Sequence, residues 1–178
     1  MRWKFIDQII ETDELTHIKG EKRFPMNEEW HQDHFPKSPI VPGVLQIEVV
    51  ANLAGKLILL RMLKESLKWE APILLKTGEC RFKEIIRPGE LIQVEVIIEK
   101  YSRRLVYSTG TLSVNNKECA TISIASARIP VTTVGDPQVL VPWQVQDILE
   151  VYPGIGKEMQ NRFEEIIARV KEESVAPA

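Results

Sequence analysis

The hydrophobic positions in the middle of the chain repeat with helical spacing over about twenty residues. From Val44 onward, apolar side chains recur every three or four positions and widen to cover most of the surface for four turns. The far end of this segment is polar and carries Arg61, Lys64 and Glu65. A helix that is apolar nearly all round is normally buried. The pattern therefore predicts one long central helix that another layer of structure encloses.

The chain after this helix changes to the two-residue spacing of β-strands. Before the helix, residues 15–24 alternate only in part and predict an edge strand. Residues 3–10 fit either a helix or a strand. Four closely spaced strands after one buried helix predict an antiparallel sheet curved around that helix, an α+β domain. These four strand-like stretches are 73–86 (in two parts), 91–100, 105–114 and 118–130.

The chain beyond residue 130 has a different organisation. Residues 131–141 predict a linker, and 143–152 predict a short helix that a proline-glycine pair ends. Residues 157–171 form a clear amphipathic pattern with one apolar stripe. This tail is too small to be an independent domain, so we expect it to pack on the main domain or on another subunit. The predicted organisation is a main domain at 1–130 and a linker with a C-terminal helix at 131–178.

Composition and charge exclude some classes of partner but do not change the predicted fold. The chain has 178 residues and a net charge of −2, which does not favour nucleic acid or an anionic membrane as a partner. We find no signal-peptide pattern, and the most apolar run, 57–60, is far too short to span a bilayer. Cys80 and Cys119 lie far apart, which predicts reduced thiols rather than a disulfide. We therefore expect a cytoplasmic protein without a nucleic-acid or membrane partner.

Candidate chemistry gathers where the central helix begins. His34 stands in a proline-rich loop, and a histidine carries protons near neutral pH. Glu48 lies about one and a half turns inside the helix, where a carboxylate is costly to bury unless something pairs with it or uses it. Gly43 at the helix start lets a ligand approach backbone amides that can polarise a carbonyl. A second interpretation stays open: a loop histidine held by Asp33, and a carboxylate that reaches solvent at a subunit boundary.

These residues resemble a known signature. The segments are His34-Phe35-Pro36, Pro39, Pro42-Gly43-Val44-Leu45 and Glu48, with fourteen positions from the histidine to the glutamate. They look like the motif of the β-hydroxyacyl-acyl carrier protein dehydratases of bacterial type II fatty-acid synthesis, and the likeness covers roughly 3–130. The resemblance implies a hotdog fold, in which an antiparallel sheet wraps one long helix. It also implies a homodimer, in some members a trimer of dimers, with an acyl tunnel and shared active sites at the dimer interface.

The resemblance further implies a reaction and the residues that perform it. His34 would remove the α-proton of a 3-hydroxyacyl thioester, and the partner's Glu48 would protonate the departing hydroxyl. The Gly43 amide would hold the thioester carbonyl, with Val44 and Phe35 at the substrate. The substrate would be a thioester of acyl carrier protein or coenzyme A, and the products a trans-2-enoyl thioester and water. No metal or organic cofactor is implied.

Several positions depart from the common pattern of that family. Asp33 and Lys37 replace glycines that flank the histidine motif, and Gln46 replaces an apolar residue. Asn52 stands where a glutamine often supports the acid. A carboxylate beside His34 would favour the protonated imidazole and weaken it as a base. Two alternatives therefore stay open: a non-catalytic module that binds acyl chains or a carrier protein, and an acyl thioesterase.

Overall fold

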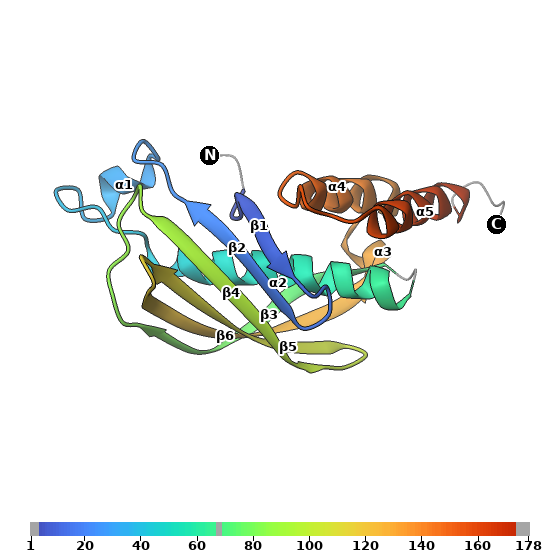
Figure 1. Ribbon diagram of the computed structural model, residues 1–178, viewed down its shortest axis with the longest axis horizontal. Coiled ribbons are helices and arrows are strands. Elements are labelled where there is room, and N and C mark those ends of the chain that lie inside the picture. Colours follow the sequence, from blue (N-terminus) through green and yellow to red (C-terminus); the bar gives the residue numbers. More distant parts are fainter. Residues whose placement is uncertain (1–3, 67–68, 174–178) are drawn as a thin grey trace.

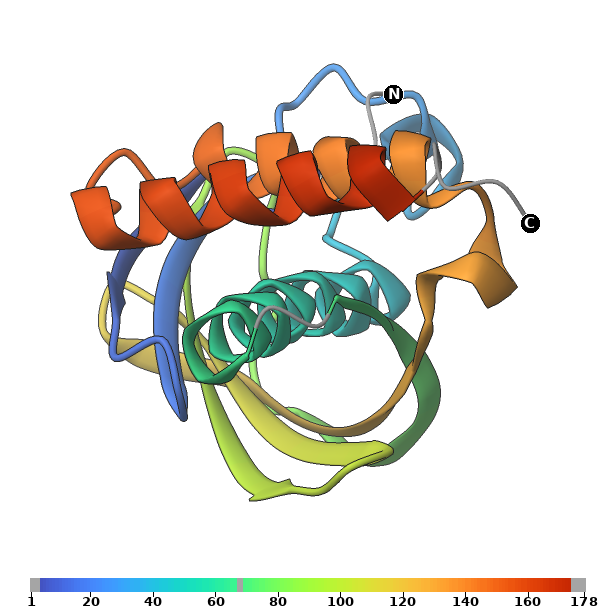
Figure 2. The ribbon, with the colours of Figure 1, turned by 90° about the vertical axis from the view of Figure 1, so that its right-hand side faces the viewer.

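The computed structural model describes residues 4–66 and 69–173, and its centre is one long helix in the hollow of a curved sheet (Figure 1, Figure 2). Within this part of the chain the sheet has the strand order β1-β2-β4-β5-β6-β3, and every neighbouring pair is antiparallel. The strands are β1 (Gln8–Thr12), β2 (His17–Arg23), β3 (Glu70–Phe82), β4 (Leu91–Tyr101), β5 (Leu105–Val114) and β6 (Lys117–Pro130). The helices are α1 (Trp30–Asp33), α2 (Gly43–Glu65), α3 (Val131–Val134), α4 (Pro137–Leu149) and α5 (Lys157–Glu173). The predicted α+β architecture is confirmed.

The central helix α2 is held by apolar contacts along most of its length. Leu53, Leu57 and Leu60 are fully buried. Strand β5 passes so close that a Cβ atom on Gly110 would lie 2.4 Å from Val50, so only glycine fits there. By length and composition α2 could also cross a membrane, but 56% of that apolar window is buried inside the protein. The buried part of the helix forms the core of this domain.

The strands after α2 follow the predicted stretches closely. Strands β4, β5 and β6 begin and end within one residue of the prediction, because a one-sided sheet alternates cleanly between core and solvent. The prediction of an edge strand at 15–24 was wrong. That stretch contains β2, which pairs with β4 on one side and with β1 on the other, so β1 and β3 are the two edges.

The predicted linker at 131–141 is largely helical, which corrects the sequence interpretation. It contains α3 and the first residues of α4. Asp136 caps α4 by accepting a hydrogen bond from the Gln138 amide at 2.9 Å, and Pro137 occupies the first turn. A glycine, an aspartate and a proline in succession are typical of a turn, but the last two are equally typical of a helix start. The predicted helix at 157–171 is confirmed as α5.

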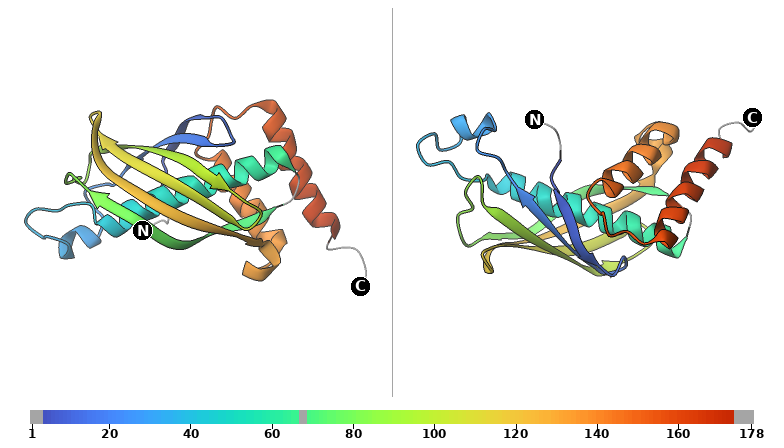
Figure 3. Two further views of the ribbon diagram at one scale, coloured as in Figure 1. Left: turned by 90° about the horizontal axis from the view of Figure 1, so that it is seen from below. Right: turned by 45° about the horizontal axis from the view of Figure 1, so that its top comes forward.

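Helices α4 and α5 pack as a pair over the open side of the domain, at the end of the molecule opposite α1 (Figure 1, Figure 3). Their buried residues include Val145 and Ile148 of α4 and Phe163 of α5. Arg162 of α5 donates to the Leu63 carbonyl at 2.9 Å, which ties the pair to the end of α2. The tail therefore packs on its own domain, which is one of the two predicted placements.

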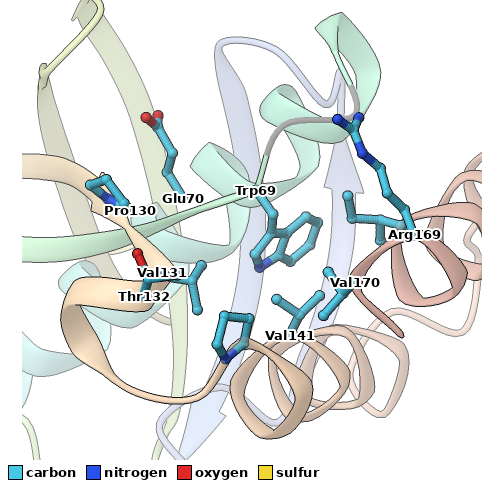
Figure 4. A pocket seen from close by; sticks show the side chains of 10 residues that line it. Trp69, Glu70, Pro130, Val131, Thr132, Val141, Arg169 and Val170 are labelled. Carbon is cyan, nitrogen blue, oxygen red and sulfur yellow. The ribbon is translucent and has the colours of Figure 1, made fainter. Parts of the chain in front are cut away.

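The junction between this helical pair and the sheet is not completely filled. A cavity of about 290 Å³ remains there (Figure 4). Its walls include Trp69 before β3, Val131 of α3, Val141 of α4 and Val170 of α5. The indole Nε1 of Trp69 donates to Gln144 Oε1 of α4 at 2.6 Å, so the tail and the domain are also linked by a polar contact at this junction.

A buried ion pair between Lys56 of α2 and Asp147 of α4 also holds the tail on the domain. The side chain of Lys56 is only 4% exposed. Burial lowers the pKa of Lys56, and the Asp147 carboxylate opposes that shift by favouring the charged ammonium. The lysine therefore depends on its partner, since an unpaired buried charge is strongly unfavourable.

We expect Asp147→Asn to lower the free energy of unfolding by about 2–3 kcal/mol, because it leaves the Lys56 ammonium buried without a counter-charge. Urea unfolding measures the loss. The variant's deficit shrinks as the pH rises, because its unfolded state binds the Lys56 proton more tightly than its folded state. In a Lys56→Met background the same substitution has almost no effect on stability. An equal cost in both backgrounds would contradict the pairing.

Candidate active site

The candidate base His34 lies at the end of α1, in an ordered turn that projects beyond the start of α2 (Figure 1). Its amide donates to the Trp30 carbonyl at 3.0 Å, and its half-buried ring packs edge-on against Phe35 at 4.8 Å. Phe35 has a φ of 57°, which is rare for a bulky residue, and its side chain is 58% exposed. Strained, exposed residues of this kind cluster at functional sites. The turn therefore presents an imidazole and an aromatic ring outward.

The other two histidines have partners elsewhere, which singles out His34. His17 on β2 bonds through Nε2 to Glu95 of β4 at 2.7 Å, and this contact lowers the pKa of Glu95. His31 is only 5% exposed, and its Nε2 lies 3.1 Å from the Pro25 carbonyl oxygen. Its ring lies against the Trp30 indole, with the two ring planes tilted by 51°.

The start of α2 presents backbone amides that have no intrahelical acceptor. The first intrahelical bonds are those that Leu45 and Gln46 donate to the Pro42 carbonyl, at 3.0 and 3.2 Å. The amides of Gly43 and Val44 precede them, and among the described residues no side chain caps the helix from Pro42. These amides and the helix dipole together suit a carbonyl oxygen that gains negative charge.

The Phe82 ring lies close to Gly43. It is 3.0 Å from the point that a Cβ atom on Gly43 would occupy, so a larger residue there requires this half-exposed ring to shift by a few tenths of an ångström. Val44 is 70% exposed, which leaves the predicted substrate-binding side chain open to solvent in a single chain. Gln46 is buried, and its Nε2 donates to the Val41 carbonyl at 3.1 Å. This hydrogen bond links the buried glutamine of α2 to the loop that precedes the helix.

The candidate acid Glu48 enters a pocket of about 180 Å³, here called the Glu48 pocket. The glutamate is half-buried and is held by interactions of its own. His34 is not among the described residues that line this pocket, so one chain does not bring the two predicted catalytic groups together in it. The lining residues come from three elements: Glu48, Ala51, Asn52, Gly55, Lys56 and Leu59 of α2, Pro72 and Leu74 of β3, and Trp143, Gln144 and Asp147 of α4.

Sequence reasoning missed the contribution of α4 to this pocket. Lys56 was the available signal, since a lysine on an otherwise apolar helix needs a counter-charge. Its partner Asp147 is 91 positions away, too far for a sequence pattern to connect them. Within the described residues no cluster of three or more potential metal ligands occurs, and Cys80 and Cys119 are free thiols. The chemistry available here is therefore that of an imidazole, a carboxyl and peptide amides.

Comparison with known proteins identifies the family of this chain. The FabA-like domain matches residues 2–123, so α3, α4 and α5 lie outside the match. A 3-hydroxyacyl-[acyl-carrier-protein] dehydratase FabZ of Thermoanaerobacter sp. (strain X514) is 35% identical over 119 residues, 67% of this chain and 82% of that protein. A FabZ of Clostridium botulinum (strain Eklund 17B / Type B) is 37% identical over 114 residues, 63% of this chain and 78% of that protein.

Two solved structures share the fold at low identity. The dehydratase heterocomplex ApeI:P of Xenorhabdus doucetiae has a TM-score of 0.59 at 14% identity and covers 73% of this chain and 86% of that one. The smu.793 protein of Streptococcus mutans UA159, bound to acetyl CoA, has a TM-score of 0.53 at 8% identity, with 69% and 88% covered. They confirm the predicted hotdog fold. By the extent of its match and the identity of these relatives, this chain belongs to the FabA-like domain family, together with the FabZ dehydratases that its histidine and glutamate signature resembles.

Proposed function

We propose that this protein removes water from 3-hydroxyacyl thioesters of acyl carrier protein and yields trans-2-enoyl thioesters for fatty-acid synthesis. The observation that carries the proposal is the dehydratase signature in its structural setting. His34 stands on a strained turn that precedes α2, the amides of Gly43 and Val44 begin that helix, and Glu48 lies in a pocket on it. The predicted reaction class is confirmed at the level of the family by the FabZ relatives.

The proposed mechanism is an acid-base elimination. Neutral His34 takes a proton from C2, and the electrons of that bond form the double bond between C2 and C3. The bond from C3 to the hydroxyl breaks, and Glu48 supplies the proton that makes the leaving group water. The amide of Gly43 stabilises the charge that develops on the thioester oxygen. Val44 and Phe35, whose side chains are both exposed, bind the substrate.

We infer a homodimer with shared active sites from the edge strand β3. Its residues Ile73, Leu74 and Leu75 are 41%, 39% and 59% exposed, and an exposed apolar edge strand is an aggregation hazard unless another chain covers it. Pairing with the β3 strand of a second copy would cover this edge. It would also bring the partner's histidine turn toward the flank of α2 that carries Glu48. Assembly of dimers into trimers, and location in the cytoplasm, remain expectations from the family resemblance.

The FabZ relatives are named for acyl carrier protein substrates, and exposed basic side chains around the histidine turn suit an anionic carrier of this kind. Lys37 is exposed, and Arg87 is an exposed neighbour whose Nη1 lies 3.2 Å from Ser38 Oγ. Two further candidates, Arg81 and Lys83, are instead engaged with carboxylates on the sheet. The carrier protein would therefore dock on the His34 side of the molecule.

Incubation of the purified protein with 3-hydroxyacyl and enoyl thioesters of acyl carrier protein and of coenzyme A tests the proposal. Reversible loss and gain of water, followed by enoyl absorbance and mass, is the expected result. Release of free thiol would instead assign an acyl thioesterase. Saturable binding with no turnover would assign a non-catalytic binding module.

A further inference from the structure

The Glu48 pocket has one wall that the family match does not include. Its α2 side carries Asn52 and Lys56 beside the carboxylate, and the small residues there, Ala51 and Gly55, leave room next to Glu48. The opposite wall is α4, which presents Trp143. The match to the FabA-like domain ends at residue 123, before α4 begins. This wall is therefore an addition to the shared fold.

The α4 wall is held in place by several contacts. Asp147 is paired with the buried Lys56, and Gln144 accepts from the Trp69 indole at 2.6 Å. On the same helix, Val145 and Ile148 are buried in the core. Trp143 is nevertheless 60% exposed. A large aromatic side chain that borders a pocket on a fixed helix provides a rigid surface for an apolar ligand.

We propose that Trp143 determines which acyl chains this enzyme accepts, by forming the wall against which the carbons beyond C3 lie. The inference rests on the proposed function, because it needs Glu48 beside the C3 hydroxyl. The rest of the acyl chain then continues from Glu48 along Ala51 and Gly55. A pocket of about 180 Å³ is smaller than the roughly 300–1,000 Å³ of whole-ligand sites, so it suits one part of a substrate.

The test is kcat/KM for a series of 3-hydroxyacyl thioesters of increasing chain length. Trp143→Ala removes the wall, and we expect the ratio of kcat/KM for long chains to that for short chains to rise about tenfold or more. Trp143→Phe gives an intermediate shift. Leu149→Ala, an exposed apolar residue of α4 outside the pocket, keeps the wild-type profile. An unchanged profile in Trp143→Ala would overturn the proposal, as would dissociation of the dimer with no change in chain preference.

A binding experiment separates this inference from the proposed reaction. Enoyl thioesters are titrated into the wild type and into Trp143→Phe, and tryptophan emission is recorded. A change in emission that is present in the wild type and absent in the variant supports contact between the acyl chain and Trp143, even if no substrate is dehydrated. Turnover by the wild type with identical emission changes in both proteins would overturn the contact and leave the dehydratase function standing.

Discussion

Replacement of His34 by alanine lowers kcat for dehydration by about 10²–10⁴-fold, because the reaction loses the base that takes the C2 proton. The side chain lies on an exposed turn and its removal opens no core cavity, so the fold and the unfolding midpoint stay close to those of the wild type. The variant also loses exchange of the C2 proton with solvent deuterium, which NMR or mass spectrometry detects independently of water loss.

His17→Ala is the matched control for this experiment. It also removes a histidine, but one that pairs with Glu95 on the sheet. It therefore keeps the wild-type kcat and the wild-type rate of proton exchange. If His34→Ala exchanged the C2 proton at the wild-type rate, His34 would not be the base and another group would have to take that role.

Much of the fold follows from local patterns in the sequence. An apolar surface on nearly all sides of α2 requires a layer around it, and alternation in β4 and β5 supplies one. The length and position of these elements were therefore predictable. Strand β3 was located less well, as 73–86 instead of Glu70–Phe82, because most of its residues are exposed on both faces and show no alternation.

Contacts between distant segments account for what the sequence could not predict. The burial of His31 depends on Trp30 and on the Pro25 carbonyl, which no periodic pattern reports. The contact of α4 with the Glu48 pocket depends on Lys56 and Asp147, which meet only after the chain folds. The motif from His34 to Glu48 predicted the candidate groups through its likeness to a family signature, but spacing along one chain says nothing about which chain supplies each group.

Whether His34 and Glu48 of one site come from the same subunit or from different subunits decides the activity of a heterodimer of two inactive variants. We expect a heterodimer of one His34→Ala chain and one Glu48→Gln chain to regain about half of the wild-type activity, because a two-fold interface gives it one intact site and one site that lacks both groups. Each homodimer of either variant remains inactive. Coexpression with two different affinity tags and tandem purification isolate the heterodimer for the dehydration assay.

The result depends on geometry alone, since the heterodimer carries the same two substitutions, one in each chain, in either arrangement. Within one chain, His34 lies on the turn before α2 and is not among the described residues of the Glu48 pocket. If each site used the histidine and the glutamate of the same chain, both sites of the heterodimer would lack one group, and it would be as inactive as the homodimers. Restored activity therefore requires that the two groups act across the subunit boundary, where a second β3 edge would bring them together.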